Sequence, residues 1–133
     1  MADPHPYRVA LESRDAAALA AALHPDVIFD TPAFEEPIRG RKNVLALFGV
    51  LATVFEDPEI TDELCGESSR AITFRLSVEG HAIEGFDHLR LDEDGLVRRI
   101  TVSMRPLASL QVLAERMAEP VAILAAGQKE AGA

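Results

Sequence analysis

Apolar and polar residues alternate with a period of two in the second half of the chain, which is the pattern of half-buried β-strands. We expect four such strands, at residues 59–66, 70–79, 82–91 and 96–106. Because alternate side chains of a strand point to the same face, one face of the second strand is apolar. That face carries Ile72, Phe74, Leu76 and Val78. Short turn sequences between the strands predict an antiparallel meander with one buried face and one solvated face.

The first half of the chain has the three-and-four spacing of amphipathic helices instead. Helices are expected from about Tyr7, over the alanine-rich segment 16–23, from about Arg41 to Phe55, and again over 107–118. A short strand at 27–31, placed at an edge of the sheet, and a proline-containing loop at 32–39 separate the second helix from the third. Helices followed by consecutive strands predict an α+β fold, with the helices packed on one face of a curved sheet.

Length, charge and cysteine content restrict the class of protein. A chain of 133 residues is expected to form one domain, with a core at about 7–118 and a loosely ordered alanine- and glycine-rich tail at 119–133. The net charge of −9 disfavours nucleic-acid binding, and a single cysteine excludes an internal disulfide. Neither a secretory signal nor a membrane-spanning apolar run is visible. We therefore expect a cytoplasmic protein with no nucleic-acid or membrane partner.

A curved sheet covered by short helices encloses a cone-shaped space, and its expected lining is mostly apolar with a few polar groups. Such a lining is typical of a site for a small molecule. The residues expected to contact this ligand are Phe29, Thr31, Phe48, Leu51, Phe74, Leu76, Leu89, Val102 and Met104. The pattern thus predicts an internal pocket for a small apolar molecule.

One carboxyl group lies on the apolar side of its strand. Asp87 shares a face with Ile83, Leu89 and Leu91, and burial of a carboxylate is unfavourable unless the group is paired or protonated. Asp87 is therefore either a structural acid, bonded to Tyr7 or to backbone amides, or a neutral acid that donates a hydrogen bond to a ligand. Tyr7, the only tyrosine, is either a second donor to that ligand or a helix residue with its hydroxyl at the surface.

Four segments, by their order and spacing, resemble the nuclear transport factor 2-like superfamily, in particular its SnoaL-like and ketosteroid-isomerase-like branches. They are Tyr7-x-x-Ala10-Leu11-x-x-Arg14-Asp15, Val27-x-x-Asp30-Thr31-Pro32, Glu36-Pro37-x-Arg39-Gly40 and Asp87-His88-Leu89-Arg90, within residues 7–104. The resemblance implies a cone-shaped α+β barrel, and it places Tyr7 and Asp87 on the oxyanion hole of the isomerase-like branch. The catalytic base of that branch falls on Thr31, and threonine is a poor base at neutral pH.

Three functions are open at this point. The first is an isomerase or polyketide-cyclase-like enzyme, in which Tyr7 and protonated Asp87 polarise a carbonyl group while Asp30, Glu35 or Glu36 acts as the base. The second is a ligand-binding protein without catalytic activity. The third is a homodimeric interaction module that pairs through the outer sheet face. That face is expected to carry Arg75, Glu79, His88, Arg90, Arg99 and Thr101.

The remaining ionisable residues show no further chemistry. No cofactor is expected, and no pair of histidines or carboxylates has the spacing of metal ligands. His5 and His81 are expected to be exposed, and His24 is expected to lie in a turn.

Overall fold

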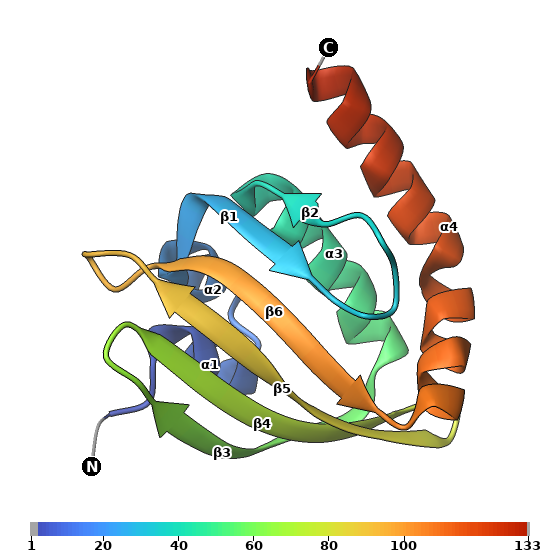
Figure 1. Cartoon of the computed structure of the whole chain (residues 1–133), viewed down its shortest axis with the longest axis horizontal. Helices are drawn as coiled ribbons and strands as arrows, with labels where there is room; N and C mark the ends of the chain where they lie inside the picture. The colour runs from blue at the N-terminus through green and yellow to red at the C-terminus, as the bar shows by residue number, and fades with distance from the viewer. Residues whose placement is uncertain (1–2, 133) are drawn as a thin grey trace.

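The computed structural model describes residues 3–132, and within this range the chain forms four helices and one six-stranded sheet (Figure 1). The helices are α1 (Pro6–Ser13), α2 (Ala16–Ala22), α3 (Arg41–Val54) and α4 (Leu107–Gly132). The strands are β1 (Leu23–Asp30), β2 (Ile38–Arg39), β3 (Glu56–Cys65), β4 (Ser69–Val78), β5 (His81–Leu91) and β6 (Val97–Arg105). The predicted order of helices and strands is confirmed, and the fold is α+β.

The sheet has the strand order β2-β1-β6-β5-β4-β3. Strands β3 to β6 form the predicted antiparallel meander, while β1 pairs in parallel with β6. The expectation that β1 lies at an edge is wrong, because β2 forms inside the predicted loop and pairs with β1. Ile38 of β2 is fully buried opposite Phe29, so its burial favours pairing over a loop. The sheet is curved but open, with β2 and β3 at its edges.

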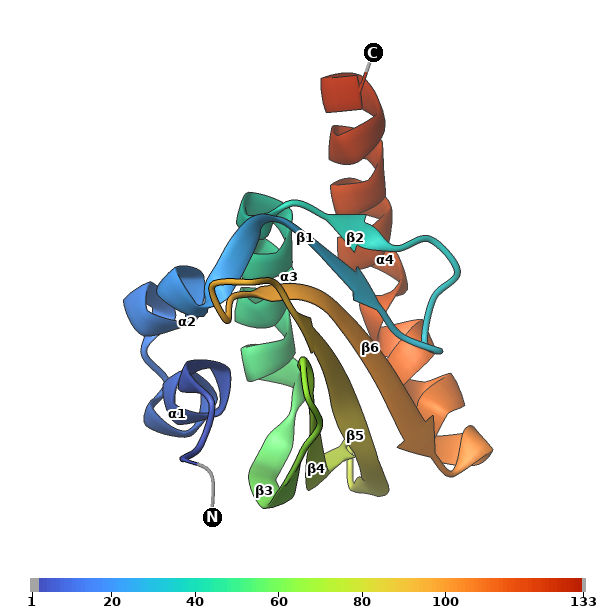
Figure 2. The ribbon, with the colours of Figure 1, turned by 60° about the vertical axis from the view of Figure 1, so that its left-hand side comes forward.

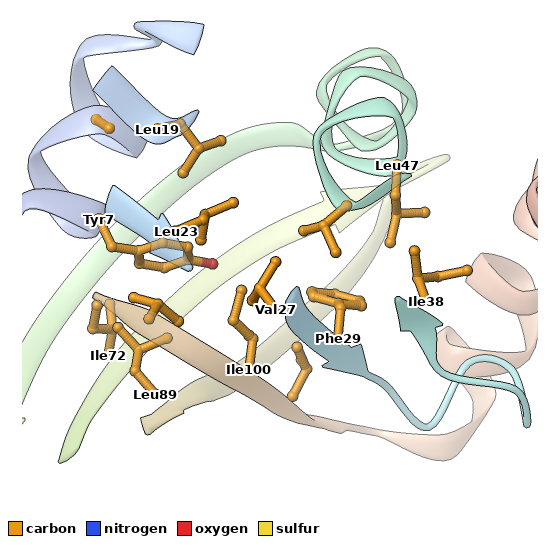
Figure 3. Close-up of a cluster of buried hydrophobic side chains, with 14 of the residues drawn as sticks. Tyr7, Leu19, Leu23, Val27, Phe29, Ile38, Leu47, Ile72, Leu89 and Ile100 are labelled. Atoms are coloured by element: carbon orange, nitrogen blue, oxygen red, sulfur yellow. The ribbon is translucent and has the colours of Figure 1, made fainter. Parts of the chain in front are cut away.

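The inner face of the sheet carries the core. Ile72, Leu76 and Val78 of β4 are buried, and Phe74 is half-buried, as their alternation predicts. Helices α1, α2 and α3 lie behind the sheet in Figure 1, and the rotated view in Figure 2 shows the strands curving around them. Figure 3 shows that Tyr7 and Leu19 from the first two helices meet Ile72, Leu89 and Ile100 from the strands.

Helix α4 is longer than the sequence predicts. It was expected to end at Ala118 and continues to Gly132, through Pro120. Proline removes one backbone hydrogen bond from a helix, whereas the alanines beyond it have the highest helix propensity. Leu113 and Met117 are buried, and the helix contacts α3 and strands β4 to β6. None of the helices in residues 3–132 is both long and apolar enough to cross a membrane.

Candidate functional site

The structure brings Tyr7 and Asp87 into direct contact. Tyr7 projects from α1 and Asp87 from the middle of β5, and the phenol hydroxyl donates a hydrogen bond to Oδ2 of Asp87 at 3.0 Å. The side chain of Tyr7 is 1% exposed, so the reading of Tyr7 with its hydroxyl at the surface is wrong. Residues that are 80 positions apart in the chain thus form one polar pair, in which Tyr7 is buried and Asp87 is half-buried.

The surroundings of this pair are apolar. On the inner face of the sheet, Asp87 lies opposite Ile72 of β4 and Val102 of β6. Figure 3 shows the ring of Tyr7 beside Leu23 and close to Ile72 and Leu89. Water is largely displaced from such an environment, and a carboxylate is poorly stabilised there.

The pKa values of the pair follow from this environment. Burial raises the pKa of Asp87 to about 6, although the hydrogen bond from Tyr7 lowers it in part. Burial also raises the pKa of Tyr7 well above its usual value, and the negative charge of Asp87 adds to this effect. Tyr7 therefore keeps its proton and is a hydrogen-bond donor at every physiological pH. Asp87 can donate a hydrogen bond only in its protonated form, which predominates below a pH of about 6.

Two phenylalanine rings extend the site away from Tyr7. The ring of Phe48, on α3, makes an edge contact with Tyr7, with 6.2 Å between ring centroids. Its other neighbour is Phe29 of β1, at 5.4 Å and nearly perpendicular. Tyr7 and Phe29 are buried, whereas Phe48 is only half-buried. Phe48 therefore lies between the Tyr7–Asp87 pair and the half-buried residues at the margin of the core.

The residues expected to line a pocket divide into two groups. Phe29, Leu76, Leu89 and Val102 are buried in the core. The half-buried group consists of Thr31, Phe48, Leu51, Phe74 and Met104. Phe74 and Met104 lie on either side of Gly85, on the two neighbouring strands. Because Gly85 is two residues before Asp87 in β5, these half-buried side chains lie on the same face of the sheet as Asp87.

Two surface hollows lie elsewhere. A groove of about 510 Å³ separates α3 from α4 and is lined by Ala46, Val50, Glu115, Arg116, Glu119, Pro120, Ile123 and Leu124. A shallower hollow of about 410 Å³ lies beside the β3–β4 turn, where its lining includes His88, Arg90 and Arg98. Neither hollow is lined by Tyr7 or Asp87, so neither is the cone-shaped pocket expected from the sequence.

Two of the residues considered for a catalytic base have partners outside the Tyr7–Asp87 pair. The hydroxyl of Thr31 accepts a hydrogen bond from the backbone N–H of Ala33 in the turn after β1. The carboxylate of Asp30 forms an ion pair with Arg99, with 2.8 Å between Oδ2 and Nη2. Glu35 and Glu36 are exposed in the loop that follows. In this arrangement Thr31 and Asp30 are both engaged in other contacts.

The sequence interpretation missed His5, which is 5% exposed and not at the surface as expected. Its Nδ1 accepts a hydrogen bond from the backbone N–H of Tyr7 at 3.0 Å, and its Nε2 lies 2.8 Å from the carbonyl oxygen of Gly95. A signal for this role was present, because Pro6 marks the first turn of a helix. The residue before it is then the N-cap, which normally accepts a backbone hydrogen bond.

Glu63 is the second residue that sequence reasoning missed. Its side chain is 5% exposed, and its Oε2 accepts hydrogen bonds from Arg70 at 2.7 Å and from the backbone N–H of His5 at 3.0 Å. Arg8 on α1 lies 3.5 Å from the other carboxylate oxygen. An irregularity in β3 between Ile60 and Asp62 shifts the alternation of its side chains. The period-two pattern of the sequence therefore does not predict that the carboxylate of Glu63 faces inward.

Within residues 3–132, no three His, Cys, Asp or Glu side chains lie close enough together to hold an ion.

An open, curved sheet with three helices over its inner face is the arrangement of proteins with a cystatin-like fold. Residues 6–100 match the family described as SnoaL-like domain. This match covers more than half of the chain, and the protein therefore belongs to the SnoaL-like family. The resemblance proposed from the four sequence segments is confirmed.

Solved structures show the same relationship. A steroid delta-isomerase from Pseudomonas aeruginosa is 30% identical, covering 90% of this chain and 89% of its own, with a TM-score of 0.78. An uncharacterised bacterial protein with a cystatin-like fold from Silicibacter pomeroyi is 26% identical over 94% and 92% of the two chains, with a TM-score of 0.81. A protein of ketosteroid-isomerase-like fold from Catenulispora acidiphila, in complex with trimethylamine, is 15% identical over 79% and 85%, with a TM-score of 0.61. None of the curated proteins compared with the chain matches it.

Proposed function

We propose that this protein binds a small apolar molecule through a carbonyl or phenolic oxygen, with Tyr7 and Asp87 as the polar partners of that oxygen. The observation that carries the proposal is the 3.0 Å hydrogen bond between these side chains in an otherwise apolar interior. Two hydrogen-bond donors that converge in a region of low dielectric stabilise an oxygen carrying partial negative charge. In the ligand-free protein, Tyr7 donates to Asp87. A ligand oxygen within reach of both side chains would accept a hydrogen bond from Tyr7 and, below a pH of about 6, from protonated Asp87.

The half-buried residues around the pair suggest how an apolar ligand reaches it. Phe48, Leu51, Phe74 and Met104 are half-buried, and Phe48 already contacts Tyr7. Burial of such side chains against a ligand is favourable by about 25 cal/mol for each Å² of apolar surface removed from water. We propose that the ligand packs against these side chains, with its oxygen directed at Asp87.

A naphthol should bind to the wild-type protein, and the two polar residues should contribute separately. We expect Tyr7→Phe to weaken the affinity about tenfold and Asp87→Leu at least tenfold, because each removes one hydrogen bond to the ligand oxygen. Fluorescence titration of the naphthol measures both effects. Asp30→Asn, at the outer-face ion pair with Arg99, is the matched control and should leave the affinity unchanged. Equal affinities for the wild type, Tyr7→Phe and Asp87→Leu would refute the proposal.

Isomerase activity is the second candidate function. It is favoured by the 30% identity to a steroid delta-isomerase over nine-tenths of this chain. The pair would polarise the carbonyl group, and a carboxylate base would move the proton. Because Thr31 stands at the expected base position and Asp30 pairs with Arg99, the base would have to come from Glu35 or Glu36. Conversion of a β,γ-unsaturated steroid ketone to its conjugated isomer, followed by ultraviolet absorbance, distinguishes turnover from binding alone.

We further propose that the outer face of the sheet pairs two copies of the chain. Phe86 is 40% exposed at the centre of this face, and its cross-strand neighbours are Thr73 and Ser103. The next row on one side carries the ion pair between Arg105 and Glu84. An exposed aromatic residue with uncharged cross-strand neighbours and polar residues around it is typical of the centre of a protein–protein interface.

Phe86→Asp should therefore convert a dimer into a monomer, because two carboxylates would be brought together at the centre of the interface. Sedimentation velocity over a range of protein concentrations measures the change. Leu107→Asp introduces the same charge at a residue that is 70% exposed on α4, and it should leave the dimer intact. A wild-type protein that sediments as a monomer at every concentration would contradict this proposal without affecting the first.

A further inference from the structure

The ring of His5 connects the two elements that carry the buried pair. Its Nδ1 accepts a hydrogen bond from the backbone N–H of Tyr7, at the start of α1. Its Nε2 lies 2.8 Å from the carbonyl oxygen of Gly95, in the turn that follows β5. A carbonyl oxygen only accepts hydrogen bonds, so Nε2 carries the proton and Nδ1 is the acceptor. The ring is held in one tautomer between the helix of Tyr7 and the strand of Asp87.

The backbone of His5 adds a third attachment. Its N–H donates to Glu63 on β3 at 3.0 Å, and Glu63 in turn binds Arg70 on β4. This carboxylate is buried among charged and polar donors, and such a group is costly to separate from its partners. The segment before α1 is consequently attached to β3 and to the β5–β6 turn.

The position of the Tyr7 hydroxyl depends on the orientation of α1. The hydroxyl is at the far end of a long side chain, so a small rotation of the helix moves it out of hydrogen-bond distance from Asp87. Helix α1 has only eight residues, and the first N–H groups of a helix have no partner within it. His5 supplies an acceptor to one of these groups, which is the N–H of Tyr7 itself. The polar side chains of a binding site need to be held within about 0.5 Å of the geometry that binds the ligand.

We propose that His5 is a positioning residue, whose ring fixes α1 so that the phenol hydroxyl of Tyr7 meets the carboxylate of Asp87. Asn or Asp would cap a helix equally well, but the imidazole also spans the distance to Gly95. His5 does not touch the proposed ligand. Its effect on ligand affinity rests on the proposed function, whereas its effect on the pair can be measured without any ligand.

The test is an NMR titration of the carboxyl carbon of Asp87 in four proteins. Because the Tyr7 hydrogen bond lowers the pKa of Asp87, Tyr7→Phe should raise it by about one unit. We expect His5→Ala to raise it by at least half as much. In the double variant, the pKa should equal that of Tyr7→Phe alone, since His5 acts only through Tyr7. A purely stabilising residue would leave the pKa of Asp87 unchanged.

Two further variants keep the test decisive. His24 provides the matched control, because its Nδ1 also accepts a backbone hydrogen bond, from Asp26 at 2.9 Å; His24→Ala should not change the pKa of Asp87. His5→Asn retains an acceptor for the Tyr7 N–H, and it should restore at least part of the wild-type value. If His5→Ala fails to fold, His5→Leu, which fills similar space without an acceptor, and the Tyr7→Phe/His5→Leu double variant replace it, with the same expected absence of additivity.

The results separate this proposal from the proposed function. An unchanged pKa in His5→Ala, or additive shifts in the double variant, would overturn the positioning role even if the naphthol binds. If the shifts are non-additive but the naphthol does not bind to the wild type, His5 positions a buried pair that has another purpose, and only the proposed function fails.

Discussion

Gly85→Ala should destabilise the protein by at least about 3 kcal/mol, a loss at the upper end of those caused by overpacking. Gly85 lies in β5 between Phe74 of β4 and Met104 of β6. A Cβ atom at this position would overlap the backbone carbonyl oxygen of Ser103 and lie 3.0 Å from the Cα of Met104. Because these are backbone atoms of a neighbouring strand, the clash cannot be relieved by a side-chain rotation.

Urea unfolding followed by circular dichroism measures this loss. Gly49→Ala is the matched control, since Gly49 is exposed on α3 and no atom lies within 4 Å of its would-be Cβ. Alanine in place of glycine inside a helix stabilises it by about 0.5–1 kcal/mol. Glycine-to-alanine substitution should therefore lower the free energy of unfolding at Gly85 and raise it at Gly49. A loss below about 1 kcal/mol in Gly85→Ala would show that β6 can move away from β5.

Asp87→Asn should stabilise the folded protein at neutral pH, by an amount that vanishes in acid. The carboxyl group has a pKa of 3.8 without its environment and about 6 in the folded protein. The folded state therefore binds the proton more tightly, and Asp87 destabilises it progressively as the pH rises from about 4 through 6. About two pKa units correspond to about 3 kcal/mol. Asparagine removes the buried charge and can still accept a hydrogen bond from Tyr7.

The measured quantity is the difference in unfolding free energy between Asp87→Asn and the wild type, at pH values from 4 to 7.5. This difference should grow by about 2.5 kcal/mol across the range and level off above a pH of about 6.5. Asp26→Asn, at an exposed position after α2, controls for the loss of one carboxyl group. A difference that is constant across the range would mean that Asp87 titrates normally in the folded protein.

Much of the fold could be predicted because it depends on local periodicity. The alternation around Phe74 and Leu76 defined β4 and its inner face, and the spacing of Val44, Leu47 and Leu51 defined α3. The inward direction of Asp87 followed from the same alternation. The sequence left several partners open for Asp87, and a contact with Tyr7 was one of them. The hydrogen bond between the two side chains shows that this contact is made.

The missed features depend on contacts between distant segments. Ile38 forms β2 only because Phe29 is already placed to receive it. His5 is buried by the turn at Gly95, which lies 90 residues later. Glu63 faces inward because a bulge in β3 resets the alternation. None of these is visible in a short window of sequence. The extension of α4 past Pro120 was not predicted either, although its alanines favour a helix.

The parallel pairing of β1 with β6 has a consequence for the order in which the chain acquires its structure. Phe29 aligns with Ile100, so about seventy residues lie between the two strands. The meander of β3 to β6 requires only short loops, and local contacts of this kind form quickly, whereas distant ones first incur the entropy of loop closure. During synthesis on the ribosome, β1 has no parallel partner until β6 has left the exit tunnel. Until then β1 can pair with β2 and contact α3, but its other edge stays unpaired.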